Sequence, residues 1–171
     1  MTMDKSFTIQ IENIDRITAA LRAYSTIAAP RVADAINKSL AILAKNGDDS
    51  TFQFKTPREF RTGYLSATWG SPGQGLALAT VANLSGRIWS NAGYAIYVHE
   101  GTAPHVITVK TKRVLANTKT GQIFGRSVNH PGTKPNRFIP RIIDKSQNDI
   151  GAAFRAALAY IAQEIAQQTN P

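Results

Sequence analysis

Three histidines and one glutamate are the residues of this chain whose types could support metal or acid–base chemistry. His99 and Glu100 are adjacent, and His105 and His130 follow them. Imidazole nitrogens and a carboxylate are ligands that zinc accepts in proteins. These residues lack a short ligand spacing such as His-Glu-x-x-His, and a Gly-Thr pair separates His99 from the other two histidines. The spacing therefore favours histidines that hydrogen-bond turn backbone, and we expect no metal and no cofactor.

A nucleophile, a histidine and an acid can also be combined on paper. Ser127 or Thr102 would be the nucleophile, with His130 as the base and Glu100 as the acid. The sequence contains no Gly-x-Ser-x-Gly elbow, and its glycine-rich stretches lack the Lys-Ser/Thr that ends a phosphate-binding loop. We therefore expect no catalytic residues and a protein that is not an enzyme.

The charge pattern is the strongest functional signal. Residues 101–143 contain eight Lys or Arg and no Asp or Glu, in a chain whose formal net charge is +9. Solvated surfaces usually mix both signs, so a wholly basic stretch favours contact with something acidic. Two targets fit, namely DNA phosphates bound without sequence readout and an acidic protein surface. The basic patch that we expect at such an interface consists of Lys110, Lys112, Arg113, Lys119, Arg126, Lys134 and Arg137.

Two Gly-Thr pairs flank most of this basic stretch. Gly101 and Thr102 follow an apolar run, and Gly132 and Thr133 lie about thirty residues further on. Glycine adopts positive φ without the steric cost that other residues meet. We expect both glycines to occupy turns with positive φ, so that the two Gly-Thr turns position the basic segment between them.

The elements that must position these residues begin with a short strand and helices. Alternating polarity predicts a half-buried strand at 7–12, and helical spacing predicts a helix over 14–24. A second helix is expected from Pro30 to about Asn46-Gly47, with Val32, Ile36, Leu40 and Leu43 on one stripe. The two helical stretches would form either a helical hairpin or one long kinked helix. Residues 48–63 predict a loop or an irregular segment.

An antiparallel β block is expected next. Apolar runs between Gly, Pro and Asn turns predict strands at 64–69, 76–82, 86–90 and 94–99. Short strands at 106–110 and 113–115, a turn at 117–121 and a returning strand at 122–124 predict a protruding basic β-ribbon over 106–126.

The chain is expected to end in a long helix that starts at Pro140. Its apolar residues Ile143, Ile150, Phe154, Leu158, Ile161 and Ile165 recur at helical spacing. The element order predicts one α+β domain over 1–171, with an antiparallel sheet on which the N-terminal helices and the C-terminal helix pack. The absence of cysteine excludes disulfides and thiolate metal sites. We see no signal peptide and no apolar run of the roughly 18 residues that a membrane span needs.

Four motifs in this order resemble the tail-completion or neck proteins of long-tailed bacteriophages. They are Arg61-Thr-Gly-Tyr-Leu65, the run from Ser90 to Thr102, Pro104-His-Val-Ile107, and His130-Pro-Gly-Thr-Lys-Pro135 with Phe138 before the last helix. The resemblance covers roughly residues 30–165. It implies a structural virion protein without enzymatic activity, assembled in the host cytoplasm into a homo-oligomeric ring at the head–tail junction or upper tail.

The same resemblance implies a tail-completion, neck or tail-terminator subunit whose neighbours are head–tail connector and tail-tube proteins. Non-specific contact with packaged DNA in the channel is a further expectation, and contact with a membrane is not expected. The alternative interpretation is a non-enzymatic nucleic-acid-binding protein that uses the basic β-ribbon. Steep salt dependence of DNA binding would favour this alternative, whereas stoichiometric presence in purified particles would favour the virion protein.

Overall fold

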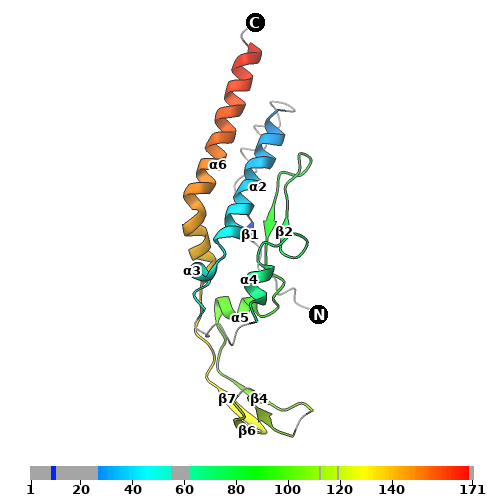
Figure 1. Cartoon of the computed structure of the whole chain (residues 1–171), viewed down its shortest axis with the longest axis vertical. Helices are drawn as coiled ribbons and strands as arrows, with labels where there is room; N and C mark the ends of the chain where they lie inside the picture. Colours follow the sequence, from blue (N-terminus) through cyan, green and yellow to red (C-terminus); the bar gives the residue numbers. More distant parts are fainter. Residues whose placement is uncertain (1–8, 11–26, 55–61, 112, 119, 170–171) are drawn as a thin grey trace.

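The computed structural model describes residues 9–10, 27–54, 62–111, 113–118 and 120–169 of the chain. The molecule is elongated, with a helical body at one end and a β-ribbon at the other (Figure 1). Several sequence predictions fall outside the described residues: the helix at 14–24, most of the strand at 7–12, Arg61, and Lys112 and Lys119 of the basic patch.

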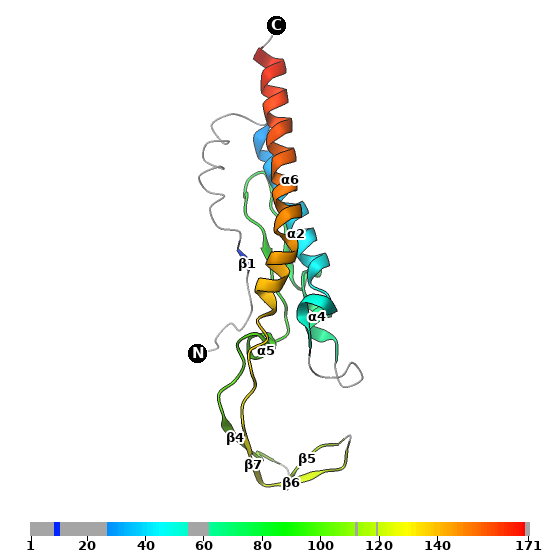
Figure 2. The same ribbon diagram turned by 90° about the vertical axis from the view of Figure 1, so that its left-hand side faces the viewer.

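Two long antiparallel helices form the body. They are α2 (Ala28–Asn46) and α6 (Phe138–Thr169), which lie side by side in both views (Figures 1 and 2). Pro30 sits in the first turn of α2, where its missing N–H costs nothing. The predicted stripe of α2 is buried along its whole length, and it comprises Val32, Ile36, Leu40 and Leu43. This helix is therefore confirmed from start to end.

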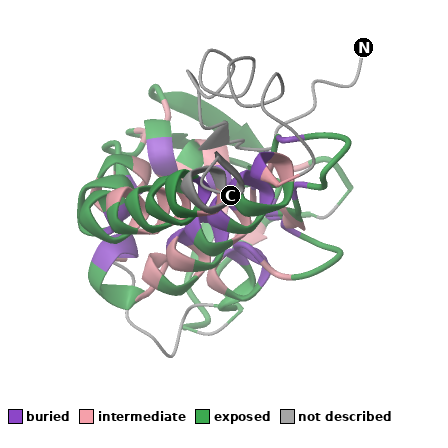
Figure 3. Cartoon of the chain, turned by 90° about the horizontal axis from the view of Figure 1, so that it is seen from above, coloured by how far each residue is buried: buried purple, intermediate pink, exposed green. Residues whose placement is uncertain are grey.

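The predicted stripe of α6 is only partly correct. Ile161 is buried and Ile150 and Phe154 pack against the core, but Ile143 and Leu158 are exposed. The helix starts at Phe138 and not at Pro140. Phe138 and Ile142 in its first turns are both fully buried in the core. Seen along the long axis, the buried residues gather toward the middle of the body, and the outward helix faces are exposed (Figure 3).

A small antiparallel sheet lies beside α2. Its central strand β3 (Arg87–Ile88) pairs with β1 (Ile9–Gln10) on one side and β2 (Leu76–Ala77) on the other. Ile88 is fully buried. With the helices and the other β pairs, this sheet confirms the expected α+β class.

The strands expected at 76–82 and 86–90 are much shorter than predicted. For 76–82 the reason is visible at Ala79, whose amide and carbonyl both bond to the side chain of Asn37 on α2, at 2.8 and 3.1 Å. One side-chain amide thus replaces the strand partner that the backbone would otherwise need. The segment after β2 is consequently held by a helix and not by a sheet ladder.

Two predicted strands are helices, and one predicted loop contains a helix. The prediction for 64–69 is wrong because α4 (Tyr64–Thr68) buries Leu65 and Thr68, which are three residues apart. The prediction for 94–99 is wrong because α5 (Ala95–Glu100) buries Ala95 and His99, which are four apart. Such spacings lie on one helical face, whereas a strand would bury every second residue.

The irregular segment predicted at 48–63 contains α3 (Asp49–Phe52). Asp48 caps this short helix by accepting hydrogen bonds from the amides of Ser50 and Thr51. Phe52 then enters an aromatic cluster, where its ring centroid lies 5.1 Å from that of Phe138 and 6.2 Å from that of Trp69. All three rings are buried. This cluster joins α3, the end of α4 and the start of α6.

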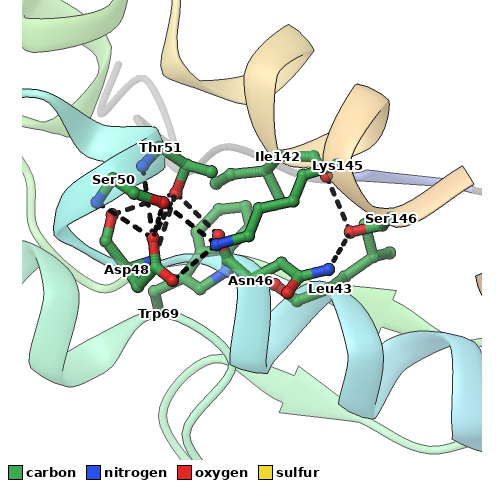
Figure 4. Close-up of polar contacts among 9 residues, drawn as sticks. All are labelled: Leu43, Asn46, Asp48, Ser50, Thr51, Trp69, Ile142, Lys145 and Ser146. Carbon is green, nitrogen blue, oxygen red and sulfur yellow. Dashed lines mark hydrogen bonds and ion pairs between the residues drawn. The ribbon is translucent and has the colours of Figure 1, made fainter.

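Polar contacts reinforce the same junction (Figure 4). Asn46 at the end of α2 donates to the Ser146 hydroxyl of α6 at 2.9 Å, and Ser146 donates to the Ile142 carbonyl. Lys145 donates to a carboxylate oxygen of Asp48 at 2.6 Å. The Lys145 ammonium, with the Ser50 hydroxyl, holds the pKa of the Asp48 carboxyl well below its usual range. The helices are thus fixed to one another at the end of the body that faces the ribbon.

The protruding ribbon is present, with a different strand set from the one predicted. Its inner half pairs β4 (His105–Thr108) with β7 (Ser127–His130), and its outer half pairs β5 (Leu115–Ala116) with β6 (Ile123–Gly125). The outer hairpin agrees with the sequence pattern, whereas β7 was not predicted from it. We call residues 101–135 the arm. It extends away from the helices in both views (Figures 1 and 2).

Candidate functional site

The arm leaves the body at the two Gly-Thr turns. Thr102 and Thr133 form an isolated antiparallel bridge, in which the Thr102 amide donates to the Thr133 carbonyl at 3.0 Å and the Thr133 amide donates to the Thr102 carbonyl at 3.1 Å. Their hydroxyl oxygens lie 3.1 Å apart. The two strands of the arm are therefore tied together where they emerge.

Both turns require glycine. Gly101 has φ 76° and ψ −174°, a region open essentially to glycine alone, and Gly132 has φ 82°. A Cβ on Gly101 would overlap the Thr133 carbonyl oxygen, and one on Gly132 would overlap the Thr102 carbonyl oxygen. The expected positive φ is confirmed at both positions. Each glycine makes room for the bridge on the opposite strand.

His105 and His130 lie just beyond this bridge, opposite each other on β4 and β7. Their ring centroids are 4.9 Å apart. His105 Nδ1 donates to the Ala103 carbonyl at 2.9 Å, and His130 Nδ1 accepts from the Gly132 amide at 3.1 Å. Both histidines therefore bond turn backbone, as the spacing predicted.

His99 belongs to the body and not to the arm. Its ring is buried, lies 5.0 Å from the Phe138 ring, and approaches Glu100 with 2.7 Å between Nδ1 and Oε1. Glu100 also forms an ion pair with Arg137 at 3.0 Å. The amides of Asn136 and Arg137 donate to the His99 carbonyl. These contacts join the end of α5 to the start of α6.

The chemistry that the sequence allowed on paper finds little geometric support. Within the described part of the chain, no three His, Asp or Glu side chains are arranged to hold a metal ion. Ser127 and His130 are three residues apart on β7, so their side chains point to opposite faces of the ribbon. The Thr102 hydroxyl pairs with Thr133 and not with a histidine.

The basic patch divides between the arm and the body. Lys110, Arg113 and Arg126 are exposed on the outer part of the arm, and Lys134 is exposed at its base. Among the residues that the structure describes, no ion pair joins any of these four to a carboxylate. Arg137 differs, because it lies outside the arm and pairs with Glu100.

The charge of the whole chain is concentrated around the arm. Residues 101–143 account for +8 of the net charge of +9, and all eleven Asp and Glu residues lie elsewhere in the sequence. Arg141, the eighth basic residue, serves the body by donating to the Thr51 carbonyl at 2.7 Å. The exposed cations of the arm thus lie in a segment of the sequence that has no carboxylate of its own.

The arm also exposes apolar side chains. Val106 is 60% exposed and Ile107 37%, and as neighbours on β4 they point to opposite faces. Ile123 and Phe124 on β6 repeat the arrangement at 68% and 42% exposure. The arm thus carries apolar residues on both faces. This surface was not predicted from the sequence, although two adjacent apolar residues in a thin ribbon are a usable signal for it.

A hollow of about 1010 Å³ lies where α5 meets the base of the arm. One wall is the outer side of α5 together with its N-cap residue Tyr94, and Tyr94 and Tyr97 are each more than 40% exposed. The opposite wall consists of turn and strand residues from both sides of the arm and includes the basic-patch residue Lys134. These residues are Gly101, Thr102, Ala103, His105, His130, Thr133, Lys134 and Pro135.

Comparison with known proteins adds no relative to this description. No family model and no curated protein matches the sequence, and no solved structure matches the fold. Among the described residues, none of the helices is both long and apolar enough to cross a membrane.

Proposed function

We propose that this chain is a structural virion protein of a tailed phage. It would form a homo-oligomeric ring as a neck, tail-completion or tail-terminator subunit, assembled in the host cytoplasm at the head–tail junction or upper tail. The observation that carries the proposal is the arm, which projects from the body with apolar side chains on both faces. The four sequence motifs that resemble phage neck proteins agree with it.

An isolated two-stranded ribbon is marginally stable in water. The arm has only short ladders, and Val106, Ile107, Ile123 and Phe124 remain open to solvent. Burying such residues against another subunit would supply the apolar contact that the body does not give. An element of this kind suits a protein that functions within an assembly, and a heterologous contact repeated around an axis closes a ring.

The exposed cations indicate the chemistry of the neighbours. Lys110, Arg113, Arg126 and Lys134 would complement acidic surfaces of head–tail connector or tail-tube proteins and steer their docking. In a ring they would also suit non-specific contact with DNA in the channel. In this proposal the body provides the stable fold, and the arm makes the contacts with other subunits.

The proposal is tested by replacing the gene in its phage with a variant in which Lys110, Arg113 and Arg126 are all Gln. We expect phage heads and tails to form but to join poorly, while the variant protein folds normally. The matched control changes Arg155, an exposed arginine on α6, to Gln and should leave joining intact. Absence of the wild-type protein from purified particles would refute the proposal.

A free nucleic-acid-binding protein is the second candidate. It is favoured by Lys110, Arg113, Arg126 and Lys134, which form no ion pair with any carboxylate in the described ranges of the chain. In that case the isolated protein should bind duplex DNA, and its binding constant K should fall with salt. A plot of log K against the logarithm of the salt concentration should have a slope of about −0.9 for each phosphate that the protein neutralises. The triple Gln variant should reduce that slope by roughly three. Weak, salt-insensitive binding by the wild-type protein would remove this candidate.

A further inference from the structure

We propose that the free edge of β4 binds an extended, acidic segment of a partner protein by β-strand addition. The inference deepens the proposed function, and it rests on that proposal for its biological setting. It specifies which part of the arm meets the partner and what chemistry the partner must have.

The first argument is the open edge of the inner ladder. β4 and β7 form a two-stranded sheet, and no other strand in the described ranges pairs with either of them. The Val109 amide donates to the Arg126 carbonyl at 3.1 Å, next to the pair of Thr108 and Ser127. Because successive residues of an antiparallel strand turn their amides and carbonyls to opposite sides, the backbone groups of Val106 and Thr108 point away from β7. Each of these two residues therefore offers a donor and an acceptor to a further strand.

The second argument is the apolar character of this edge. Every residue of β4 is exposed, and among them Val106 is 60% and Ile107 37% exposed. As neighbours in a strand they lie on opposite faces, so a strand added beside β4 would cover part of both side chains. The free edge of β7 differs, because the residues whose backbone groups point outward there are the polar Ser127 and Asn129. The apolar contact therefore selects the edge of β4.

The third argument is the charge around the edge. Lys110 lies just beyond β4, Arg126 lies just before β7, and Lys134 is exposed at the base of the arm. Residues 101–143 contain no Asp or Glu, so the segment supplies no carboxylate to these cations. A strand that carries Asp or Glu would bring the opposite charge to this surface.

A second copy of this chain does not have that chemistry. Two arms side by side would bring like charges together. The described strands of the chain contain no Asp or Glu, so these strands of a second copy would supply no acidic residue. The cations of the arm thus protect its open edge against self-association, as lysines do at exposed sheet edges. The partner is therefore a different protein.

A nucleic-acid backbone satisfies only part of this edge. Phosphate oxygens accept hydrogen bonds, so they can pair with the outward amides of Val106 and Thr108 but not with the outward carbonyls. Phosphates also give no apolar contact to Val106 or Ile107. A polypeptide strand supplies amides, carbonyls and apolar side chains together. An acidic strand thus matches the donors, the acceptors, the apolar side chains and the cations of this edge.

Binding of a defined peptide tests the inference. The probe is a fluorescein-labelled peptide of alternating Glu and Val, and its binding to the purified full chain is measured by fluorescence anisotropy. We expect this peptide to bind and a Lys-Val peptide of opposite charge not to bind. A third peptide has the Glu-Val sequence with every Val in the D form, which keeps the charge but cannot form a pleated strand. Equal binding of this third peptide would show that charge alone holds the probe, and the inference would be wrong. It would also be wrong if the Glu-Val peptide did not bind.

Two matched variants locate the contact. Thr108→Pro removes an outward amide, a change that an edge strand tolerates, and it should weaken binding of the Glu-Val peptide roughly tenfold. Ser127→Pro makes the same change on the free edge of β7 and should alter binding by less than about twofold. Hydrogen exchange at the amides of Ile107 and Val109, which point toward β7, shows whether the ladder persists in each variant. Equal weakening by both variants with the ladder intact would contradict the assignment to β4.

Amide exchange in the wild-type chain gives an answer that needs no variant. When the Glu-Val peptide is added, exchange at Val106 and Thr108 should slow, whereas exchange at Ser127 and Asn129 should not change. Slower exchange at Ser127 and Asn129 instead would place the peptide on β7. Slower exchange at Val106 and Thr108 with rising protein concentration alone would identify a second copy as the occupant. Stronger protection of these two amides by duplex DNA than by the peptide would identify nucleic acid. Each of these three results would overturn the inference.

The outcomes distinguish this inference from the proposed function. If purified particles contain the protein but the purified chain does not bind the Glu-Val peptide, strand addition at β4 is refuted and the virion role stands. If the chain binds the peptide at the β4 edge but is absent from purified particles, strand addition is supported and the virion role is refuted.

Discussion

The bridge at the base of the arm predicts a specific effect of adding one methyl group. Gly101→Ala places a Cβ at φ 76° and ψ −174°, which costs about 1–3 kcal/mol in backbone strain. The same Cβ overlaps the Thr133 carbonyl oxygen, so the turn must move away from the opposite strand. The two amide–carbonyl bonds between Thr102 and Thr133 are then lost, at about 0.5–1.5 kcal/mol each.

Together these contributions amount to about 2–6 kcal/mol against the closed bridge. Amide hydrogen exchange at Thr102 and Thr133 measures the opening of this region directly. At about 1.4 kcal/mol for each factor of ten, exchange at both amides should accelerate by roughly 25-fold or more. The effect should be local, because the amides of α2 and α6 do not depend on the bridge.

Two other glycines serve as matched controls. Gly121 also has positive φ, at 71°, but a Cβ there would have no atom within 4 Å, so Gly121→Ala should strain the outer turn without opening the bridge. Gly93 has open space and no positive φ, and Gly93→Ala should be nearly neutral. If Gly101→Ala accelerates exchange at Thr102 and Thr133 no more than Gly121→Ala does, the close approach at the bridge is not what requires glycine.

Three further predictions concern the body and the arm charges. Because the folded-state pKa of Asp48 is lowered, its pair with Lys145 stabilises the fold above about pH 4, and this stabilisation is lost as the pH falls through the lowered value. We therefore expect the free energy of urea unfolding to fall less steeply with acid in Lys145→Met than in the wild type. The difference should be at most about 1 kcal/mol, because the pair is so exposed. Asn37→Ala removes both hydrogen bonds to Ala79 and should lower the free energy of unfolding, measured by chemical denaturation, by about 1–3 kcal/mol. An unchanged midpoint would refute the idea that this side chain replaces a strand partner for Ala79. Lys110→Gln combined with Arg126→Gln should leave the melting temperature within about 2 °C of wild type, and a larger drop in calorimetry would mean that these cations support the fold.

The long helices were predictable from sequence because many residues repeat the same signal. In α2 the buried stripe repeats over several turns, and Pro30 and the Asn46-Gly47 pair mark its ends. The segments 64–69 and 94–99 were not predictable in the same way. Each offers about six residues, over which helical and strand patterns overlap, and burial against the rest of the body decided between them.

The candidate site was predictable in its turns and not in its surfaces. Positive φ at Gly101 and Gly132 followed from the residue type and from the Gly-Thr pattern alone. The strand β7 was missed because Ser127–His130 has a weak apolar pattern and gains its pairing from β4. The hollow beside α5 was not predictable, because the sequence pattern predicts a strand at 94–99 and the structure has a helix there. Its two tyrosines share one side of a helix only after that correction.

The bridge between Thr102 and Thr133 also makes the arm a mechanical lever. Both strands pass through one hydrogen-bonded point, so the direction of the arm is set there and any rotation is amplified outward. At about 3.3 Å per residue, the roughly seven residues from 102 to 109 span about 23 Å, and a tilt of about 10° at the bridge would shift their end by about 4 Å. That displacement is close to the spacing between neighbouring strands, about 4.8 Å. The backbone conformation at Gly101 and Gly132 therefore determines where the far end of the arm lies.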